Sequence, residues 1–523
     1  MSAGPGEGEG AAAPTASAAS PPAPLPLRRA LPLALAAGAL LPFGLAPFEL
    51  APLAVLSFAL ALAVLHGRDA RSALLVGWVL GLGRYGVGVS WIYVSIHEHG
   101  NASVLLAGLL VALFVAFMAV FPALAAMAFG ALRTRSAASA ACAFTACQLL
   151  LEWVLTWFLT GFPWLFAGYS QLGWPLSGWA PVTGVLGVSL FTVLSGAALW
   201  ALWVARGRGT AVRALLAAVL LAWLAGAGLA RVEWSRPDGE PLEVALVQGA
   251  IPQAVKWRRE MRQPILDRYL ELSEDHWDAD LLLWPEAALT VYARDSAGLL
   301  DRLGARARRS ESSLVLGLPD YDFAPDDPRR VRLRNTAIAL GAGEGRYVKQ
   351  RLVPFGEYVP LEGLLRGLIE FFDLPMSRSR PGPAGQSPLR IDGGIGMSMA
   401  ICYEIAYGEL VRDLSADAAL LATISNDTWF GDSIGPSQHL QIARMRALEL
   451  SRPLLRATND GITALVDHRG RIAGRLSRFE TGVLRGSVQP RRGTTPYARL
   501  GGWPVLMLAL LLLLPALRAR PRP

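Results

Sequence analysis

The chain has 523 residues, of which 53% are hydrophobic and 17% are charged, with a formal net charge of +8 and a mean hydropathy of +0.37. This composition is too apolar for an ordinary soluble globule, and the length allows more than one domain. The positive charge does not indicate nucleic-acid binding, because many arginines flank hydrophobic segments instead of gathering on one helix or tail. Three cysteines without metal-site spacing exclude a disulfide framework.

The N-terminal segment 1–27 is rich in Ala, Gly, Pro and Ser. It has too few large apolar side chains to offset its chain entropy, so we predict a disordered tail. Arg28 and Arg29 precede the first apolar segment, and a twin-arginine signal peptide is the competing interpretation. Six more hydrophobic segments follow before any soluble-looking sequence, which favours a membrane domain.

Eight hydrophobic segments approach the ~20 residues that a helix needs to cross a ~30 Å hydrocarbon core. The predicted spanning helices lie at about 30–46, 48–65, 72–93, 103–132, 137–157, 181–205, 212–230 and 500–517. The first seven form a predicted membrane domain at 28–232, and the last is a C-terminal transmembrane helix at 498–518.

Arginines lie at alternate junctions of these helices: Arg28, Arg29, Arg68, Arg71, Arg133, Arg135, Arg206, Arg208 and Arg213. The positive-inside rule therefore places the N-terminus in the cytoplasm, and seven crossings place residues from Arg231 to about Arg499 outside. The last helix returns the chain, so that Arg518, Arg520 and Arg522 lie inside.

One outer loop, at 159–171, is rich in aromatic residues such as Trp164 and Tyr169. An aromatic belt at the lipid headgroups is one interpretation, and a loop that shapes a lipid-facing entrance is the other.

From about 240 to 490, short apolar segments alternate with helical ones. The expected strands are Glu243–Val247, Leu281–Trp284, Ser313–Leu318, Thr336–Leu340, Ile395–Ile401, Ala418–Ile424, Pro453–Ala457 and Ile462–Val466. The expected helices include Arg262–Leu272, Gly298–Arg308 and Ser437–Glu449. This order predicts an α/β or α+β sheet domain at 240–490.

Glu286, Lys349 and Cys402 each follow one of the apolar, strand-like segments of this domain. Loops at strand ends are where α/β sheets assemble their sites, so these side chains are expected to converge. Each also has a structural interpretation, as a helix N-terminal charge, a surface lysine and a small core residue. Their joint occurrence at strand ends favours a site.

A thiol, a carboxylate and an ammonium group form a coherent set for nucleophilic catalysis. The thiolate is the nucleophile, and the carboxylate is a general base that removes its proton. The ammonium group lowers the thiol pKa and stabilises the oxyanion of a tetrahedral intermediate, together with backbone N–H groups just after Cys402. The six histidines lack metal-site spacing, and no Gly-rich phosphate loop occurs, so no metal and no cofactor are expected.

Trp284-Pro285-Glu286, Lys349 with Leu352–Glu357, and Cys402-Tyr403-Glu404 are similar to the Glu-Lys-Cys set of the nitrilase superfamily. With the multi-helix N-terminal half and the closing helix, the chain resembles the bacterial apolipoprotein N-acyltransferases. The resemblance also covers Val247–Gln253, Lys256-Trp257, Gly161–Trp164, Ser425–Gly431 and Arg456–Gly461.

The resemblance implies an extracytoplasmic, nitrilase-like αββα sandwich beside the helical membrane domain, and a ping-pong reaction. Cys402 would take the sn-1 acyl chain of a phospholipid, usually phosphatidylethanolamine, as a thioester. The α-amino group of an S-diacylglyceryl-cysteine apolipoprotein would then receive it as an amide. Glu286 would be the general base, and Lys349 would stabilise the oxyanion.

The resemblance further implies supporting or substrate-binding roles for Glu357, Tyr403, Glu404, Trp257, Trp429 and Asn426. We expect Glu357 and Glu404 to position Lys349 and tune its charge, and Trp257 to be a mobile lid or a lipid-facing residue. The implied protein is a monomer of the bacterial inner membrane, with a periplasmic catalytic domain.

Two other functions fit parts of the sequence. A membrane-anchored amidase would use the same three residues but release a free acid. A transporter or lipid-binding protein would use Arg84 and Glu152, which are charged residues inside predicted spanning segments.

Overall fold

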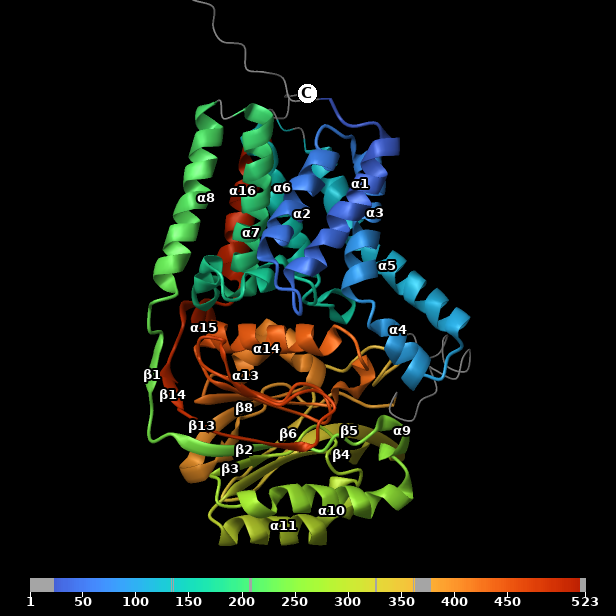
Figure 1. The fold of residues 1–523 in the computed structure, drawn as a ribbon, viewed down its shortest axis with the longest axis vertical. Coiled ribbons are helices and arrows are strands. Elements are labelled where there is room, and N and C mark those ends of the chain that lie inside the picture. The colour runs from blue at the N-terminus through green and yellow to red at the C-terminus, as the bar shows by residue number, and fades with distance from the viewer. Residues whose placement is uncertain are drawn as a thin grey trace, which may run out of the picture.

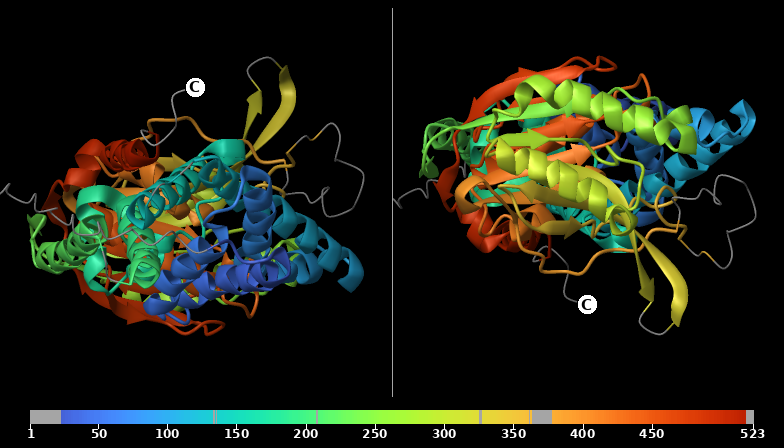
Figure 2. Two further views of the ribbon diagram at one scale, coloured as in Figure 1. Left: turned by 90° about the horizontal axis from the view of Figure 1, so that it is seen from above. Right: turned by 90° about the horizontal axis from the view of Figure 1, so that it is seen from below.

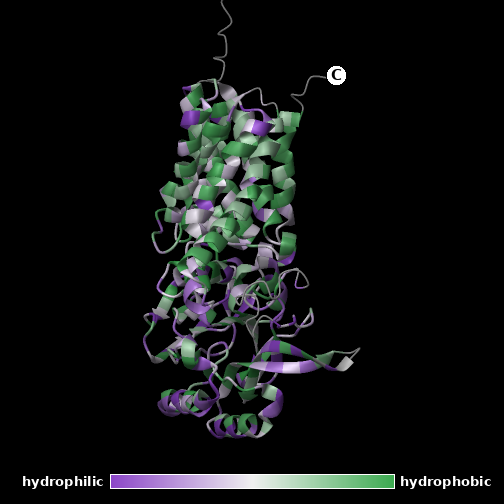
Figure 3. Ribbon diagram, turned by 90° about the vertical axis from the view of Figure 1, so that its right-hand side faces the viewer, coloured by the Kyte–Doolittle hydropathy of each residue, from purple (hydrophilic) through white to green (hydrophobic). Residues whose placement is uncertain are grey.

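The computed structural model describes residues 23–517 apart from 133, 135, 207–208, 325–326, 361 and 363–377. Most of the predicted tail, several of the arginines in the charge pattern and the C-terminal arginines therefore lie outside the described residues. Figure 1 shows a bundle of helices at one end of the molecule and layered sheets and helices at the other. Apolar residues dominate the bundle along its length, whereas polar residues are more frequent in the layered part (Figure 3).

The bundle consists of apolar helices close to the predicted positions. They are α1 (Leu27–Leu40), α2 (Ala51–Leu65), α3 (Ala70–Gly88), α5 (Val104–Ala131), α6 (Ala137–Val154), α7 (Ala180–Ala205), α8 (Thr210–Leu229) and α16 (Trp503–Leu517). Among the described residues, five helical segments are long and apolar enough to span a membrane, which include α1, α5, α6, α7 and α8. The α3 helix becomes a sixth if it is joined to Ile92–His99, which is bent from it by 66°, whereas α2 and α16 are shorter apolar helices.

Arg84 and Glu152, the charged residues inside the bundle, contact each other. Their side chains approach to 3.5 Å, and both are buried. Arg84 also donates to the carbonyl of Leu165 at 2.5 Å, and Glu152 accepts from the amide of Ala167 at 2.8 Å. The pair therefore anchors the loop that follows α6, which gives these residues a structural explanation that needs no transport path.

This loop lies between the bundle and the layered part. Its Trp164, Phe166 and Tyr169 side chains are each only 1% exposed. Together with buried residues of α7 and α14 (Gly435–Leu450) they belong to one continuous apolar core. An aromatic belt at the lipid headgroups is therefore wrong for these three residues, which are packing residues at an internal interface.

The layered part contains two six-stranded sheets, with strand orders β13-β2-β3-β4-β5-β6 and β12-β11-β10-β9-β8-β7. The strands of the first sheet are β2 (Leu242–Gln248), β3 (Leu281–Leu283), β4 (Ser313–Ala324), β5 (Asp327–Gly341), β6 (Arg346–Val348) and β13 (Gly482–Val488). Those of the second are β7 (Leu389–Ile391), β8 (Ile395–Ile401), β9 (Leu420–Ser425), β10 (Leu454–Thr458), β11 (Ala464–Val466) and β12 (Ile472–Arg475). In each sheet three adjacent strands run parallel, β2-β3-β4 and β8-β9-β10.

The two sheets pack face to face, with helices on both outer faces. Alternate residues of β8, such as Met397 and Met399, pack on the other sheet, while Ala400 faces α14. Because both faces of β8 are covered, the strand is apolar except for the buried Ser398. Helices α10 (Arg262–Ser273) and α11 (Ala297–Arg309) cover the first sheet, and α13 (Gly408–Leu414) and α14 cover the second. The order of layers is thus helix, sheet, sheet, helix, with the bundle beyond α14 (Figure 1).

All eight expected strands are present, although β4 and β5 extend well beyond the predicted segments and form a hairpin that projects from the body (Figure 2). Polar residues alternate along this hairpin, which hides it from a search for apolar segments. A short ribbon of β1 (Ser235–Pro237) and β14 (Arg491–Gly493) and helix α15 (Pro496–Leu500) link the sheets to the bundle.

Candidate active site

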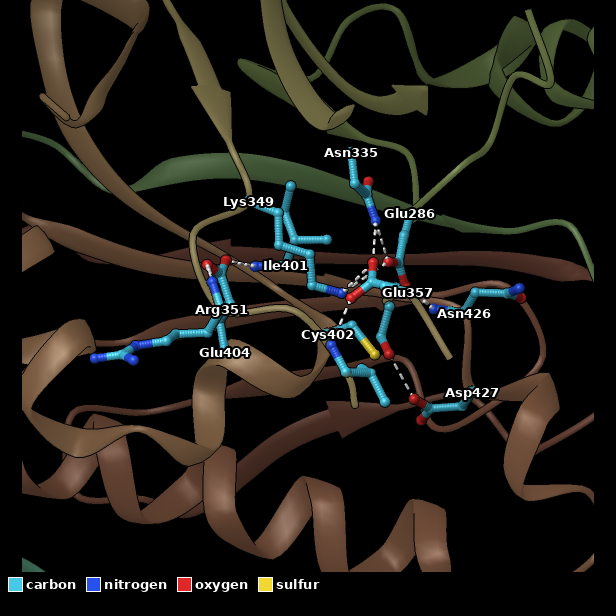
Figure 4. Close-up of polar contacts among 12 residues, drawn as sticks. Glu286, Asn335, Lys349, Arg351, Glu357, Ile401, Cys402, Glu404, Asn426 and Asp427 are labelled. Carbon is cyan, nitrogen blue, oxygen red and sulfur yellow. Dashed lines mark hydrogen bonds and ion pairs between the residues drawn. The ribbon is translucent and has the colours of Figure 1, made fainter. Parts of the chain in front are cut away.

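Glu286, Lys349 and Cys402 converge between the two sheets. Glu286 lies in the loop after β3, Lys349 directly after β6, and Cys402 directly after β8. Figure 4 shows the Cys402 sulfur close to a cluster that contains Lys349, Glu357 and Glu286. The convergence predicted from the strand ends is therefore present in the structure.

The Glu286 carboxylate is held from two sides. Its Oε1 accepts from Asn335 Nδ2 at 2.7 Å, and its Oε2 accepts from the backbone amide of Asn426 at 2.7 Å. The residue is 7% exposed. A carboxylate fixed by two donors in a nearly dry site has one orientation available, as a general base requires.

Lys349 lies between two carboxylates. Its Nζ donates to Glu357 Oε1 at 2.9 Å and to Glu286 Oε1 at 3.5 Å, and Asn335 Nδ2 also reaches Glu357 Oε1 at 3.2 Å. Burial alone would lower the pKa of Lys349, but Glu357 and Glu286 outweigh that effect and raise it. Lys349 therefore stays charged at neutral pH. Glu357 contacts its ammonium group directly, as expected for a carboxylate that positions Lys349.

Cys402 has a backbone φ of +56°, in the left-handed region that costs a non-glycine residue about 1–2 kcal/mol. Although the residue is partly exposed, desolvation of the thiol and then the charge of Glu286 raise its pKa, against the opposing effect of Lys349. The thiol therefore keeps its proton at neutral pH until a base removes it.

Glu404 supports the backbone around the site and makes no direct contact with the Lys349 ammonium. Its Oε1 accepts from the amides of Gln350 at 2.6 Å and Arg351 at 3.0 Å, and its Oε2 accepts from the amide of Ile401 at 2.8 Å. The Tyr347 hydroxyl donates to it as well. Burial raises the pKa of Glu404 to about 7, despite these donors. Glu404 thus positions Lys349 through the main chain.

We expect Glu404→Gln to lower the free energy of unfolding by about 1–3 kcal/mol, because an amide N–H₂ would face backbone N–H groups that lose their acceptor. Unfolding in detergent, followed by tryptophan fluorescence, measures the effect. Glu480→Gln, at an exposed side chain, is the matched control and should leave stability unchanged. Equal stability of the two variants would show that the Glu404 contacts contribute little.

Tyr403 connects the nucleophile to the membrane-side loop. Its hydroxyl donates to the carbonyl of Gly161 at 3.3 Å, and its ring stacks on Trp164 with centroids 6.2 Å apart. The Tyr407 hydroxyl reaches the same loop at Thr160. The residue after Cys402 therefore contacts the part of the chain closest to the bundle.

The other three predicted residues surround this centre. Asn426 contacts Glu286 directly through its backbone amide. The Trp429 carbonyl accepts from Ser95 Oγ at 2.6 Å, in the bent segment after α3. Trp257 directly follows the short helix α9 (Gln253–Lys256) and is 39% exposed. Asn426 thus belongs to the centre, while Trp429 and Trp257 lie at its borders.

Sequence reasoning missed Asn335 and Lys256 at this site. Asn335 lies within the long strand β5, and no local pattern distinguishes it from other polar strand residues. Lys256 is fully buried with its Nζ 3.4 Å from the carbonyl of Glu286, and burial lowers its pKa to about 8. A signal for it existed, since Lys256 and Lys349 are the only lysines in the chain. Within the described ranges, no three His, Cys, Asp or Glu side chains group to hold a metal.

Residues 37–198 match the family described as the apolipoprotein N-acyltransferase N-terminal domain, and residues 243–497 match the carbon-nitrogen hydrolases. The apolipoprotein N-acyltransferase of Pseudomonas paraeruginosa is 47% identical over 93% of this chain and 95% of its own length. That of Vibrio cholerae is 40% identical over 91% and 94%. A member of branch 10 of the nitrilase superfamily from Saccharomyces cerevisiae is 18% identical, with a TM-score of 0.34 over 48% of this chain and 91% of its own.

Proposed function

The chain belongs to the apolipoprotein N-acyltransferase family, and we propose that it acylates the α-amino group of diacylglyceryl apolipoproteins through a Cys402 thioester. The acyl donor is a phospholipid, cleaved at its sn-1 ester, with phosphatidylethanolamine the expected headgroup. The observation that carries the proposal is the convergence of Cys402, Glu286 and Lys349 beside a loop that belongs to the helical bundle.

In the first step, Glu286 takes the thiol proton as the Cys402 sulfur attacks the ester carbonyl carbon. The carbonyl oxygen becomes an oxyanion, which Lys349 stabilises together with the Tyr403 amide. When the intermediate collapses, the C–O bond breaks, and the leaving alkoxide of the lysophospholipid receives the proton from Glu286. The acyl chain is then held on Cys402 as a thioester.

In the second step, the acceptor's neutral amine attacks the thioester carbon and Glu286 takes its proton. The C–S bond breaks as the amide forms, and the thiolate regains a proton from Glu286. The net charge of Glu286, Lys349 and Cys402 is the same before and after each half-reaction, because Glu286 gives back each proton that it takes. This sequence of two transfers is a ping-pong mechanism.

We also place the catalytic layers on the periplasmic side of the inner membrane, with all eight apolar helices crossing it and both termini in the cytoplasm. The described arginines at alternate helix junctions support this orientation. Both lipid substrates then lie in the leaflet nearest to Tyr403 and its loop, which favours acyl transfer over hydrolysis of a soluble amide.

We expect purified protein incubated with phosphatidylethanolamine to gain the mass of one acyl chain on Cys402. Neutral hydroxylamine should remove it, since thioesters are labile to that nucleophile and oxygen esters react more slowly. A diacylglyceryl-cysteine peptide should then discharge the chain and become N-acylated. Intact-protein and peptide mass spectrometry follow each step.

The alternatives predict different products. Release of free fatty acid with no N-acylated peptide would indicate a hydrolase of the amidase type. A protein that binds phospholipid but gains no acyl chain would indicate transport or lipid binding, and either result would overturn the proposal.

A further inference from the structure

Cys402 is held in its left-handed conformation from both sides of the residue. On the N-terminal side, the amide of Ile401 donates to Glu404 Oε2 at 2.8 Å. On the C-terminal side, the Cys402 carbonyl oxygen lies 3.1 Å from His439 Nε2. A strained backbone persists when its surroundings fix it. The first contact fixes the peptide group that joins Ala400 to Ile401, and the second fixes the peptide group that joins Cys402 to Tyr403.

His439 itself is part of a buried polar group. It lies on α14 with no exposed surface, and its Nδ1 is 3.1 Å from both Asp427 Oδ1 and Arg456 Nη2. Arg456 also donates to Asp427 Oδ2 at 2.6 Å, and Ser425 Oγ donates to Asp427 Oδ1 at 2.6 Å. This network joins the end of β9 and the middle of β10 to α14, so the imidazole ring cannot turn freely.

The Cys402 carbonyl determines which nitrogen of His439 carries hydrogen. A carbonyl oxygen only accepts, so Nε2 must carry a hydrogen and donate to it. This holds both for the neutral Nε2–H form, in which Nδ1 accepts from Arg456, and for the charged form, in which Nδ1 donates to Asp427. Burial and the charge of Arg456 lower the pKa of His439, which favours the neutral form. The contact to Cys402 is the same in either form.

The peptide group that joins Cys402 to Tyr403 is planar, and in its trans form the C=O and N–H bonds point in opposite directions. A donor that fixes the Cys402 C=O therefore also fixes the direction of the Tyr403 N–H. We propose that His439, backed by Asp427 and Arg456, is a positioning residue that aims the Tyr403 amide at the oxyanion. It acts through one rigid peptide group and does not touch the substrate. This inference rests on the proposed thioester chemistry.

The test compares two amide variants of His439. Glutamine can place an amide nitrogen near the position of Nε2, whereas asparagine reaches only the position of Nδ1. We expect His439→Asn to slow acylation of Cys402 by phospholipid about 10²-fold, with an unchanged KM, because an oxyanion donor is misaligned. His439→Gln should restore the rate to within about tenfold of the wild type.

Alkylation of Cys402 by iodoacetamide distinguishes a misaligned oxyanion donor from a general structural defect. A general defect would lower the rates of both acylation and alkylation. Displacement of iodide forms no oxyanion, so His439→Asn should alkylate at a rate close to that of the wild type. His468→Asn, at a partly exposed histidine bonded to Glu233, is the control and should change neither rate. If His439→Asn leaves Asp427 poorly paired and does not fold, His439→Leu fills the volume without a polar group and takes its place.

A parallel fall in acylation and alkylation, equal rates for the Asn and Gln variants, or an unchanged acylation rate would each overturn the inference. Failure of the proposed function is distinguishable from these outcomes. In that case the wild-type protein itself would gain no acyl chain from phospholipid, while its alkylation would continue.

Discussion

Cys402→Ser is expected to abolish acylation of the protein by phospholipid and to lower transfer to a diacylglyceryl peptide by at least about 10⁴-fold. A serine hydroxyl holds its proton far more tightly than a thiol, and a carboxylate such as Glu286 is too weak a base to remove it. The substitution keeps the size and polarity of the side chain, so the left-handed turn after β8 should remain. Intact-protein mass and N-acylated peptide are the two measurements.

The other two cysteines provide matched controls. Cys142 and Cys147 lie on α6 among apolar residues of the bundle. Cys142→Ser and Cys147→Ser should leave acylation intact, with at most a modest loss of stability for the more buried Cys147. Near wild-type transfer by Cys402→Ser would show that the nucleophile has been assigned wrongly.

Lys349→Met is expected to lower the rate of acyl-enzyme formation by about 10²–10³-fold, because the oxyanion loses its only cationic partner in the proposed mechanism. The same change leaves Glu286 and Glu357 close together without the ammonium group between them. Breaking a buried ion pair by removing one partner costs about 3–5 kcal/mol, so the protein should also unfold more easily. Stopped reactions analysed by mass spectrometry give the rate, and unfolding in detergent gives the stability.

Arg346→Met is the control for Lys349→Met. Arg346 lies on the same short strand, β6, and pairs with Asp320, so that the arginine is 45% exposed while the carboxylate is buried. Its loss also leaves a buried carboxylate without its ion pair and should lower stability. Acylation should change less than about twofold, because the contact of Arg346 is to Asp320 and not to Glu286, Lys349 or Cys402. Equal activity of Lys349→Met and wild type would assign oxyanion stabilisation to backbone donors alone.

Where local signals are strong, the sequence predicted that three side chains would converge, as they do in the structure. Each of Glu286, Lys349 and Cys402 follows a buried strand, and a polar residue that ends an apolar segment is visible without a structure. The contact between Glu357 and Lys349 was also expected. By contrast, the sequence does not reveal that Glu404 acts through the main chain, because two of its partners, the amides of Gln350 and Arg351, lie more than 50 residues away.

Site residues that lie within regular helices and strands could not be recognised from the sequence. His439 is on a helix that was predicted, but that helix has buried polar side chains on the face that meets the second sheet and the loop after α6. Their partners, such as Asp427, come from other elements, and no periodicity records such pairings. Asn335 similarly bridges two carboxylates from the middle of β5. The buried position of Trp164 depended on the docking of the bundle, which one sequence does not reveal.

The apolar core that unites the loop after α6, helix α7 and helix α14 also determines how the protein can be divided for study. A fragment cut at the start of β1 and before α16 would expose the apolar surface of α14, and its Tyr403 would lose the carbonyl of Gly161. Such a fragment would tend to aggregate through this apolar surface. In the fraction that stays in solution, Tyr403 next to Cys402 would lack its contact with the loop after α6. Inhibitors selected against it would be fitted to a geometry that the intact membrane protein does not have, so screening requires the whole chain in detergent or lipid.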